Sequence, residues 1–188
     1  MRRWLACGAL VAIALAAEAH GQGAASLLDL DGRAMDPFQG SRSRAIVAVF
    51  SRTDCPISNR YAPELARLHG AFAPRGVEFR LVFPGDQPVD TITRHLREFG
   101  YPFGVWRDPG FAFVDRAGAT VTPEAAVFDA RGTLLYLGRI DDRYISAARR
   151  RPAPTSRDLE EALEAILAGR PVATDRTPAI GCLINDLR

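Results

Sequence analysis

The chain has 188 residues, of which 47% are hydrophobic and 24% are charged. This length fits one globular domain, and the apolar content excludes an intrinsically disordered protein. All 24 basic residues are arginine, they are spread along the chain, and 22 acidic residues nearly balance them. Such a distribution argues against binding to a phosphate backbone, so we expect no nucleic-acid partner.

The N-terminus has the three parts of a secretory signal peptide. Arg2 and Arg3 precede an uninterrupted apolar run over residues 4–17, and an Ala-x-Ala site ends at Ala19. This run is too short to cross a membrane, which takes about 20 apolar residues. We therefore predict a signal peptide over residues 1–19 and a periplasmic or secreted mature protein without stable membrane insertion. An uncleaved anchor is the alternative.

The hydrophobic pattern of the mature chain predicts alternating strands and helices. Short apolar runs predict strands over residues 27–30, 45–50, 77–83, 105–108, 126–128 and 134–138. Helical spacing of apolar residues predicts helices over residues 56–72, 89–99, 111–117 and 155–167. This order predicts an α/β domain with three layers and a mixed sheet over residues 20–170, followed by a tail over residues 171–188.

Three groups of polar residues each predict a local structure. Thr155 and Asp158 have the spacing of a capping box at the start of the last helix. Residues 149–154 are expected to form a basic, solvated loop, with contact to an anionic lipid or a partner as the alternative. The adjacent Asp141 and Asp142 are expected to form a solvated turn, with a calcium site or an acid–base pair as the alternative.

Cys55 is the residue with the clearest chemical interpretation. It follows the predicted strand at residues 45–50, and Pro56 fits the first position of a helix, which makes Cys55 the N-cap. Unpaired N–H groups at a helix start favour a thiolate and lower a cysteine pKa from about 8.5 to about 3.5–7.5. Arg52 would reinforce this effect and Asp54 would oppose it. The alternative is a small, inert, buried side chain.

The residues around Cys55 resemble the thioredoxin superfamily. The segment from Cys55 to Ser58, with Pro63 eight residues after the cysteine, is similar to the active-site helix of that superfamily, and Thr122-Pro123 resembles its cis-proline. The stretch from Asp108 to Pro123 and the hairpin that ends at residues 138–142 look most like the redoxin branch, the peroxiredoxin-like exported proteins of bacteria. The likeness covers roughly residues 27–170.

The resemblance implies a thioredoxin-like α/β/α fold with a mixed central sheet. It also implies that Cys55 is the redox nucleophile and that a substrate groove is formed by Pro56, Ser58, Thr122 and Pro123. Ser58 stands where the superfamily has its second motif cysteine and is expected to hydrogen-bond the thiolate.

Cys182 in the tail is then the candidate resolving thiol. Cys7 would leave with the signal peptide, so Cys55 and Cys182 are the two thiols of the mature chain, and export permits a single bridge between them. The tail is long enough to reach the predicted site, and residues 180–184 are apolar enough to dock. We therefore expect a reversible Cys55–Cys182 disulfide. The alternatives are a packed tail residue or a link to another protein.

The predicted function is that of an exported thiol-dependent oxidoreductase acting on protein or small-molecule thiols, disulfides or peroxides. Ala48 and Arg52 replace the proline and the hydroxyl residue of peroxiredoxins, so a one-cysteine peroxidase is an alternative, as is a non-catalytic binding module. We expect no cofactor and no metal site, because the motif has one cysteine and the domain has only His69 and His95. His69 is expected at the surface and His95 at the solvent or the sheet edge.

The signal-peptide interpretation makes a direct prediction. Protein recovered from its native compartment should begin near His20, because cleavage after Ala19 removes the apolar run. Intact-mass spectrometry measures this directly, and a full-length, membrane-bound species would contradict the prediction.

Overall fold

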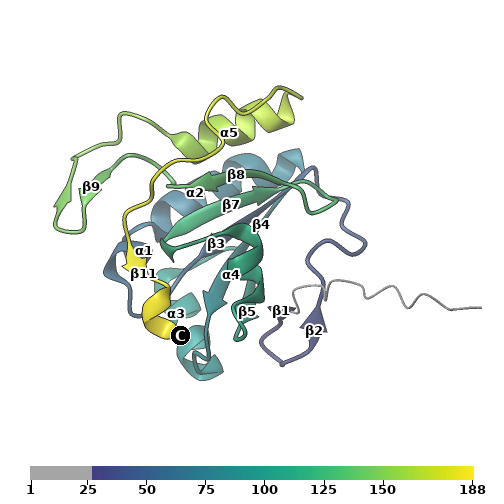
Figure 1. Ribbon diagram of the computed structural model, residues 1–188, viewed down its shortest axis with the longest axis vertical. Coiled ribbons are helices and arrows are strands. Elements are labelled where there is room, and N and C mark those ends of the chain that lie inside the picture. The colour runs from purple at the N-terminus through teal and green to yellow at the C-terminus, as the bar shows by residue number, and fades with distance from the viewer. Residues whose placement is uncertain (1–26) are drawn as a thin grey trace, which may run out of the picture.

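The structure is a computed structural model that describes residues 27–188 (Figure 1). The predicted signal peptide and its cleavage site lie outside the described residues. Within residues 27–188, no helix combines the length and the apolar character that a membrane span requires.

A mixed sheet of seven strands forms the centre of the fold, in the order β2-β1-β5-β4-β3-β7-β8. The pairs β3–β4 and β4–β5 are parallel, and the other neighbours are antiparallel. The sequence pattern thus predicted the mixed sheet correctly. The strands are β1 (Leu27–Leu28), β2 (Ala34–Met35), β3 (Ala45–Phe50), β4 (Val77–Pro84), β5 (Val105–Asp108), β7 (Glu124–Phe128) and β8 (Leu134–Gly138).

The central strand β3 divides the hydrophobic core into two clusters. All six of its residues are completely buried. Val47 and Val49 point into one cluster, whereas Ile46, Ala48 and Phe50 point into the other, because successive side chains of a strand face opposite sides. Both faces of the sheet are therefore covered.

Helices supply the two outer layers (Figure 1). Four helices contribute apolar residues to the cluster that contains Val47, and α4 contributes to the cluster that contains Phe50. This arrangement confirms the three-layer α/β/α prediction. The helices are α1 (Pro56–Arg60), α2 (Ala62–Phe72), α3 (Val89–Phe99) and α5 (Asp158–Leu167) on one face and α4 (Ala112–Ala117) on the other, and a 3-10 turn, η1 (Ala73–Arg75), follows α2.

The helix expected over residues 56–72 is interrupted at Tyr61. α1 ends at Arg60, and α2 begins at Ala62 with Pro63 in its first turn. Proline has no N–H to donate to the carbonyl four residues earlier, which belongs to Asn59, so one continuous hydrogen-bonded helix cannot form there.

The predicted capping box at residues 155–158 is wrong. Helix α5 begins at Asp158 with Arg157 as its N-cap, two residues later than the capping box requires. The hydroxyl of Thr155 donates to Asp142 at 2.5 Å, and the Asp158 carboxylate accepts from Arg139 at 2.8 Å. Both side chains are thus engaged by partners distant in sequence.

Two small antiparallel pairs lie outside the main sheet. Strands β9 (Tyr144–Ser146) and β10 (Arg149–Arg150) form a hairpin, so part of the loop expected over residues 149–154 is extended and paired. Strand β6 (Val121–Thr122) pairs with β11 (Cys182–Leu183), and the 3-10 turn η2 (Asn185–Leu187) follows β11.

Asp108 at the end of β5 fixes the start of α4. Its side chain is 1% exposed, and its Oδ2 accepts hydrogen bonds from the backbone N–H groups of Phe113 at 3.0 Å and Val114 at 2.8 Å. Burial raises the pKa of Asp108, and these N–H groups counteract the rise. The carboxylate therefore satisfies helix donors that would otherwise be buried without partners.

We predict that Asp108→Ala lowers the free energy of unfolding by about 1–2 kcal/mol, because the two helix donors lose their acceptor. Urea denaturation measures the change. Asp86→Ala is the matched control, since the Asp86 side chain is 91% exposed. Equal stabilities of the two variants would contradict the proposed role of Asp108.

Candidate active site

Cys55 lies where β3 passes into α1. The turn before it is closed by a hydrogen bond from the Cys55 N–H to the Arg52 carbonyl at 3.3 Å. Cys55 has an extended backbone and is the N-cap of α1, and the exposed Pro56 is the first helical residue, which confirms the N-cap prediction. The Cys55 side chain is completely buried. The chain thus passes directly from β3 to Cys55 at the start of α1, and other segments cover the cysteine side chain.

Side chains from α1 and from the loop between β4 and α3 hold the turn in front of Cys55. The Gln87 side-chain oxygen accepts from both the N–H and the hydroxyl of Thr53, each at 3.2 Å, and its amide nitrogen donates to the Pro84 carbonyl at 3.1 Å. The Asn59 amide donates to the Thr53 carbonyl at 3.3 Å. Sequence analysis missed both Gln87 and Asn59, because neither belongs to a motif.

Thr122 and Pro123 lie directly beside Cys55. Their peptide bond is cis, as the resemblance implied, and both residues are buried. Cys55 Sγ lies 3.1 Å from the Thr122 carbonyl oxygen, which would accept a hydrogen bond from the reduced thiol. The Glu124 carboxylate accepts from the Thr120 N–H at 2.7 Å and so supports the preceding turn.

The structure contains the expected disulfide between Cys55 and Cys182, with 6.2 Å between their Cα atoms. Strand β11 brings Cys182 to this place by pairing antiparallel with β6, with Cys182 opposite Thr122. The segment from Cys182 to η2 lies against the sheet end that carries α1 (Figure 1). Cys182 is half-buried, in contrast to Cys55.

Ser58 lies one turn after Cys55 and is 2% exposed. The Ser58 hydroxyl has no hydrogen-bond partner in this disulfide form, so its expected bond to the thiolate stays a prediction. The hydroxyls of Ser51 and Thr122 are likewise buried without a partner. Each of these three hydroxyls therefore retains the capacity to donate a hydrogen bond.

The charges next to Cys55 largely neutralise each other. Arg52 forms two hydrogen bonds with Asp54, at 3.0 and 2.9 Å, and a third with the Leu183 carbonyl at 3.3 Å. The guanidinium thus links the turn before Cys55 to the tail that carries Cys182.

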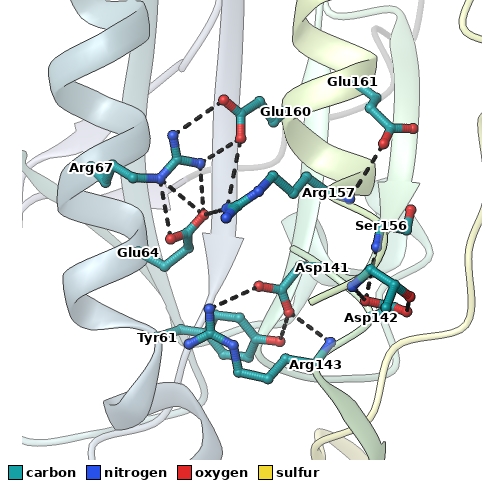
Figure 2. Close-up of polar contacts among 11 residues, drawn as sticks. Tyr61, Glu64, Arg67, Asp141, Asp142, Arg143, Ser156, Arg157, Glu160 and Glu161 are labelled. Atoms are coloured by element: carbon teal, nitrogen blue, oxygen red, sulfur yellow. Dashed lines mark hydrogen bonds and ion pairs between the residues drawn. The ribbon is translucent and has the colours of Figure 1, made fainter. Parts of the chain in front are cut away.

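The Asp141-Asp142 pair is buried, contrary to the expected solvated turn. Asp141 is 2% exposed and Asp142 is 7% exposed. Asp141 accepts from the Tyr61 hydroxyl at 2.5 Å and from the Arg143 N–H at 2.9 Å (Figure 2). Hydrogen bonds from the Thr155 hydroxyl and nearby backbone N–H groups hold the pKa of Asp142 well below its usual value. Burial raises the pKa of Tyr61, and the bond to Asp141 adds to the rise.

An ion-pair network above this pair joins α2 to α5 (Figure 2). Glu64 accepts from Arg67 at 2.7 Å and from Arg157 at 2.9 Å, and Arg67 also bonds Glu160 at 2.5 Å. Together with the buried aspartates, this network fixes α2 against the C-terminal half of the domain. Nowhere in residues 27–188 do three or more His, Cys, Asp or Glu side chains form a group suited to a metal ion.

His95 is buried rather than located at the solvent or the sheet edge. It is 4% exposed, packs against Phe83 and Phe99, and its Nε2 has no hydrogen-bond partner. His95 also lines a hollow of about 300 Å³ that reaches Thr53 and Asp54, immediately before Cys55. A larger hollow of about 540 Å³ lies along α5 and contains no cysteine.

His69 is half-buried rather than at the surface. Its ring lies 5.7 Å from Phe79 and 5.3 Å from Phe103, centroid to centroid. Neither histidine contacts the disulfide, so the structure brings together the cysteines, Pro56, Ser58 and the Thr122-Pro123 pair, but not the histidines.

No protein-family model matches the sequence. The thiol-disulfide oxidoreductase ResA of Halalkalibacterium halodurans is 24% identical over 109 residues, which make up 58% of this chain and 61% of that protein. The chain therefore matches less than two thirds of this curated relative's length.

Solved structures resemble the whole domain. An uncharacterized conserved protein from Geobacillus kaustophilus is 28% identical, with a TM-score of 0.72 over 85% of this chain and 86% of that one. A secreted Mycobacterium tuberculosis disulfide oxidoreductase homologous to E. coli DsbE is 19% identical, with a TM-score of 0.50 over 77% of this chain and 94% of that one. These likenesses confirm the thioredoxin-like fold.

The burial of His95 gives a prediction about pH. Burial lowers the pKa of His95, although the nearby Glu98 opposes this, so the unfolded chain binds the proton more readily than the folded one. The free energy of unfolding should therefore fall as the pH drops below about 6.5. His95→Phe should reduce this pH dependence, as measured by urea denaturation at several pH values.

Thr91→Val is the control, because Thr91 lines the same hollow but does not titrate. An unchanged pH dependence in His95→Phe would show that other groups cause it.

Proposed function

We propose that this thioredoxin-like protein is a thiol-disulfide oxidoreductase whose redox centre is the pair Cys55 and Cys182. The observation that carries the proposal is the disulfide between the start of α1 and the tail, formed beside Thr122 and Pro123. The likeness to ResA over 109 residues supports the same chemistry. Pro56, Ser58, Thr122 and Pro123 surround the pair and are proposed to form the substrate groove.

The different burial of the two sulfurs determines the order of the steps. Cys55 is completely buried, whereas Cys182 is half-buried and belongs to a two-stranded pair near the chain end. A thiolate needs access to the sulfur that it attacks. A dithiol reductant therefore attacks Cys182 Sγ, the Cys55–Cys182 bond breaks, and Cys55 leaves with the electron pair as a thiolate.

The second thiolate of the reductant then completes the exchange. It attacks the reductant's own sulfur in the mixed disulfide, and Cys182 leaves as a thiolate. Two electrons have passed from the dithiol, which is now a disulfide, to the protein, which holds two thiol groups after proton uptake. Oxidation of the reduced protein is proposed to take a different route, because the tail is then no longer bonded to Cys55. Cys55 attacks a substrate disulfide and expels one substrate thiolate, and Cys182 then attacks Cys55 Sγ, which releases the second substrate thiolate and restores the Cys55–Cys182 bond.

The surroundings of Cys55 suit it as the leaving group and as the nucleophile. It stands at the start of α1, where N–H groups of the first turn lack helical partners and interact favourably with negative charge. The Ser58 hydroxyl, one helical turn after Cys55, is buried without a partner and is proposed to donate to the thiolate. At the position where the superfamily has its second motif cysteine, Ser58 thus offers a hydrogen-bond donor in place of a second thiol.

Export is part of the proposal. The predicted signal peptide over residues 1–19 and the presence of a disulfide both suit an oxidising compartment. One structurally similar protein, from Mycobacterium tuberculosis, is described as secreted. We place the mature protein in the periplasm or outside the cell, acting on thiols and disulfides there.

The function is tested by mapping the attacked sulfur. Oxidised wild-type protein is mixed briefly with glutathione, quenched with an alkylating agent and digested. Peptide mass spectrometry should find glutathione on Cys182 and the alkyl group on Cys55, because Cys182 is half-buried whereas Cys55 is completely buried. The fully reduced protein should in turn reduce oxidised glutathione and regain the Cys55–Cys182 bond.

The same mapping in urea is the control, since unfolding exposes both sulfurs and should distribute glutathione between them. Glutathione found mainly on Cys55 of the folded protein would contradict the order of steps. A disulfide that neither forms nor breaks reversibly would contradict the oxidoreductase function itself.

A further inference from the structure

The tail occupies the site as an added strand. Cys182 and Leu183 pair with Thr122 and Val121, and the Ile184 N–H continues the pairing by donating to the Thr120 carbonyl at 3.0 Å. Main-chain bonds of this kind accept any extended polypeptide, because they do not depend on the side chains.

Side chains of the added strand alternate between the protein and the solvent. Cys182 points to Cys55, Leu183 is 54% exposed, and Ile184 is 1% exposed among the apolar residues that include Phe50 and Phe113. The groove therefore has one position for a sulfur and one apolar position two residues later.

A separate attachment holds the tail upstream of this groove. The Leu137 N–H donates to the Asp175 carbonyl at 2.8 Å, and the Thr177 N–H donates to the Leu137 carbonyl at 3.1 Å. The Thr177 hydroxyl also lies 2.8 Å from that of Tyr136. Because this attachment does not involve the disulfide, reduction leaves it in place and removes the covalent link only from the part of the tail that follows residue 177.

We propose that residues 180–184 occupy the binding place of an external ligand, an extended polypeptide segment that carries a cysteine. The inference rests on the proposed function, since the ligand cysteine exchanges with Cys55. In the oxidised protein the tail fills the groove. Once the disulfide is reduced, the freed tail can leave, and β6 can pair with the ligand in the same antiparallel register.

The geometry of the tail specifies the ligand more closely. A Cβ atom at Gly181 would collide with the Thr122 carbonyl, so glycine suits the position before the cysteine. Burial of Ile184 assigns a branched aliphatic residue to the second position after the cysteine. The exposure of Leu183 leaves the intervening position unrestricted. The preferred ligand is thus Gly-Cys-x-Ile or Gly-Cys-x-Val in an extended conformation.

The tethered tail competes with such a ligand. Four residues separate the Thr177 attachment from Cys182, and a short tether gives the tail an effective concentration of the order of millimolar. An external segment therefore binds well only where its own contacts match those of the tail or where the tail is weakened.

The test uses full-length Cys182→Ser protein, which retains the Cys55 thiol. The probe is a synthetic peptide with the sequence of residues 179–187, whose cysteine carries thionitrobenzoate in a mixed disulfide. The Cys55 thiolate attacks the peptide sulfur, the Cys55–peptide disulfide forms, and yellow thionitrobenzoate leaves with the electron pair. Absorbance gives the rate.

We expect the peptides with Gly181→Val or Ile184→Asn to react at least about tenfold more slowly than the native peptide, because each loses the fit or the apolar burial. The peptide with Leu183→Asn should react at the native rate, since this side chain faces the solvent.

A second arm weakens the tail of the protein itself. Ile184→Asn, added to Cys182→Ser, should raise the rate of the native peptide by about tenfold, because the competing segment loses its buried side chain. Ile145→Asn is the matched control, since Ile145 is 39% exposed in the β9–β10 hairpin.

The outcomes separate this inference from the proposed function. Equal rates for all peptides, with normal reaction of Cys55 toward the small disulfide of thionitrobenzoate, would overturn the groove alone. A Cys55 thiol that fails to react even with the small disulfide would overturn the proposed function together with the groove.

Discussion

Double-sided pairing of the fully buried strand β3 determines where every part of the site lies. Its register with β7 sets Phe50 opposite Glu124, so the end of β3 and the Thr122-Pro123 segment arrive at the same end of the sheet. A shift by one residue would turn Val47 and Val49 toward the wrong core and move Cys55 away from Thr122. Because both cores must be filled, the chain has one acceptable register, and the position of the cysteine follows from hydrophobic packing rather than from local polar contacts.

The site in turn combines distant segments of the chain. The disulfide joins residues separated by 127 positions, and Arg52 connects the turn before Cys55 to the tail through the Leu183 carbonyl. The tail therefore covers the side of Cys55 that the central sheet does not cover. Ser58 stands where the superfamily has its second motif cysteine and cannot form a disulfide. Among the described residues, Cys182 is therefore the one that can form a disulfide with Cys55.

The sequence predicted the parts of this arrangement that depend on short-range patterns. Apolar runs identified β3, β5 and β8, and the resemblance identified Cys55 and Thr122-Pro123. Features that depend on pairing between distant polar groups were not predictable in this way. Thr155 has the spacing of a helix cap, but its hydroxyl donates a hydrogen bond to Asp142 instead.

The same limitation explains two further errors and one omission. Adjacent aspartates ordinarily indicate a solvated turn, yet Asp141 is buried, and its Oδ1 accepts hydrogen bonds from the Tyr61 hydroxyl and the Arg143 N–H. His95 gave no sign of burial, since its apolar partners come from β4 and the end of α3. Gln87 supports the turn before Cys55 without any pattern in its neighbours.

The attachment of Asp175 and Thr177 to Leu137 also has a consequence for aggregation: it covers the outer edge of β8, where an open row of backbone groups would pair with a strand from another molecule. Since these hydrogen bonds do not involve the Cys55–Cys182 bond, breaking that bond would leave the edge of β8 covered at Leu137.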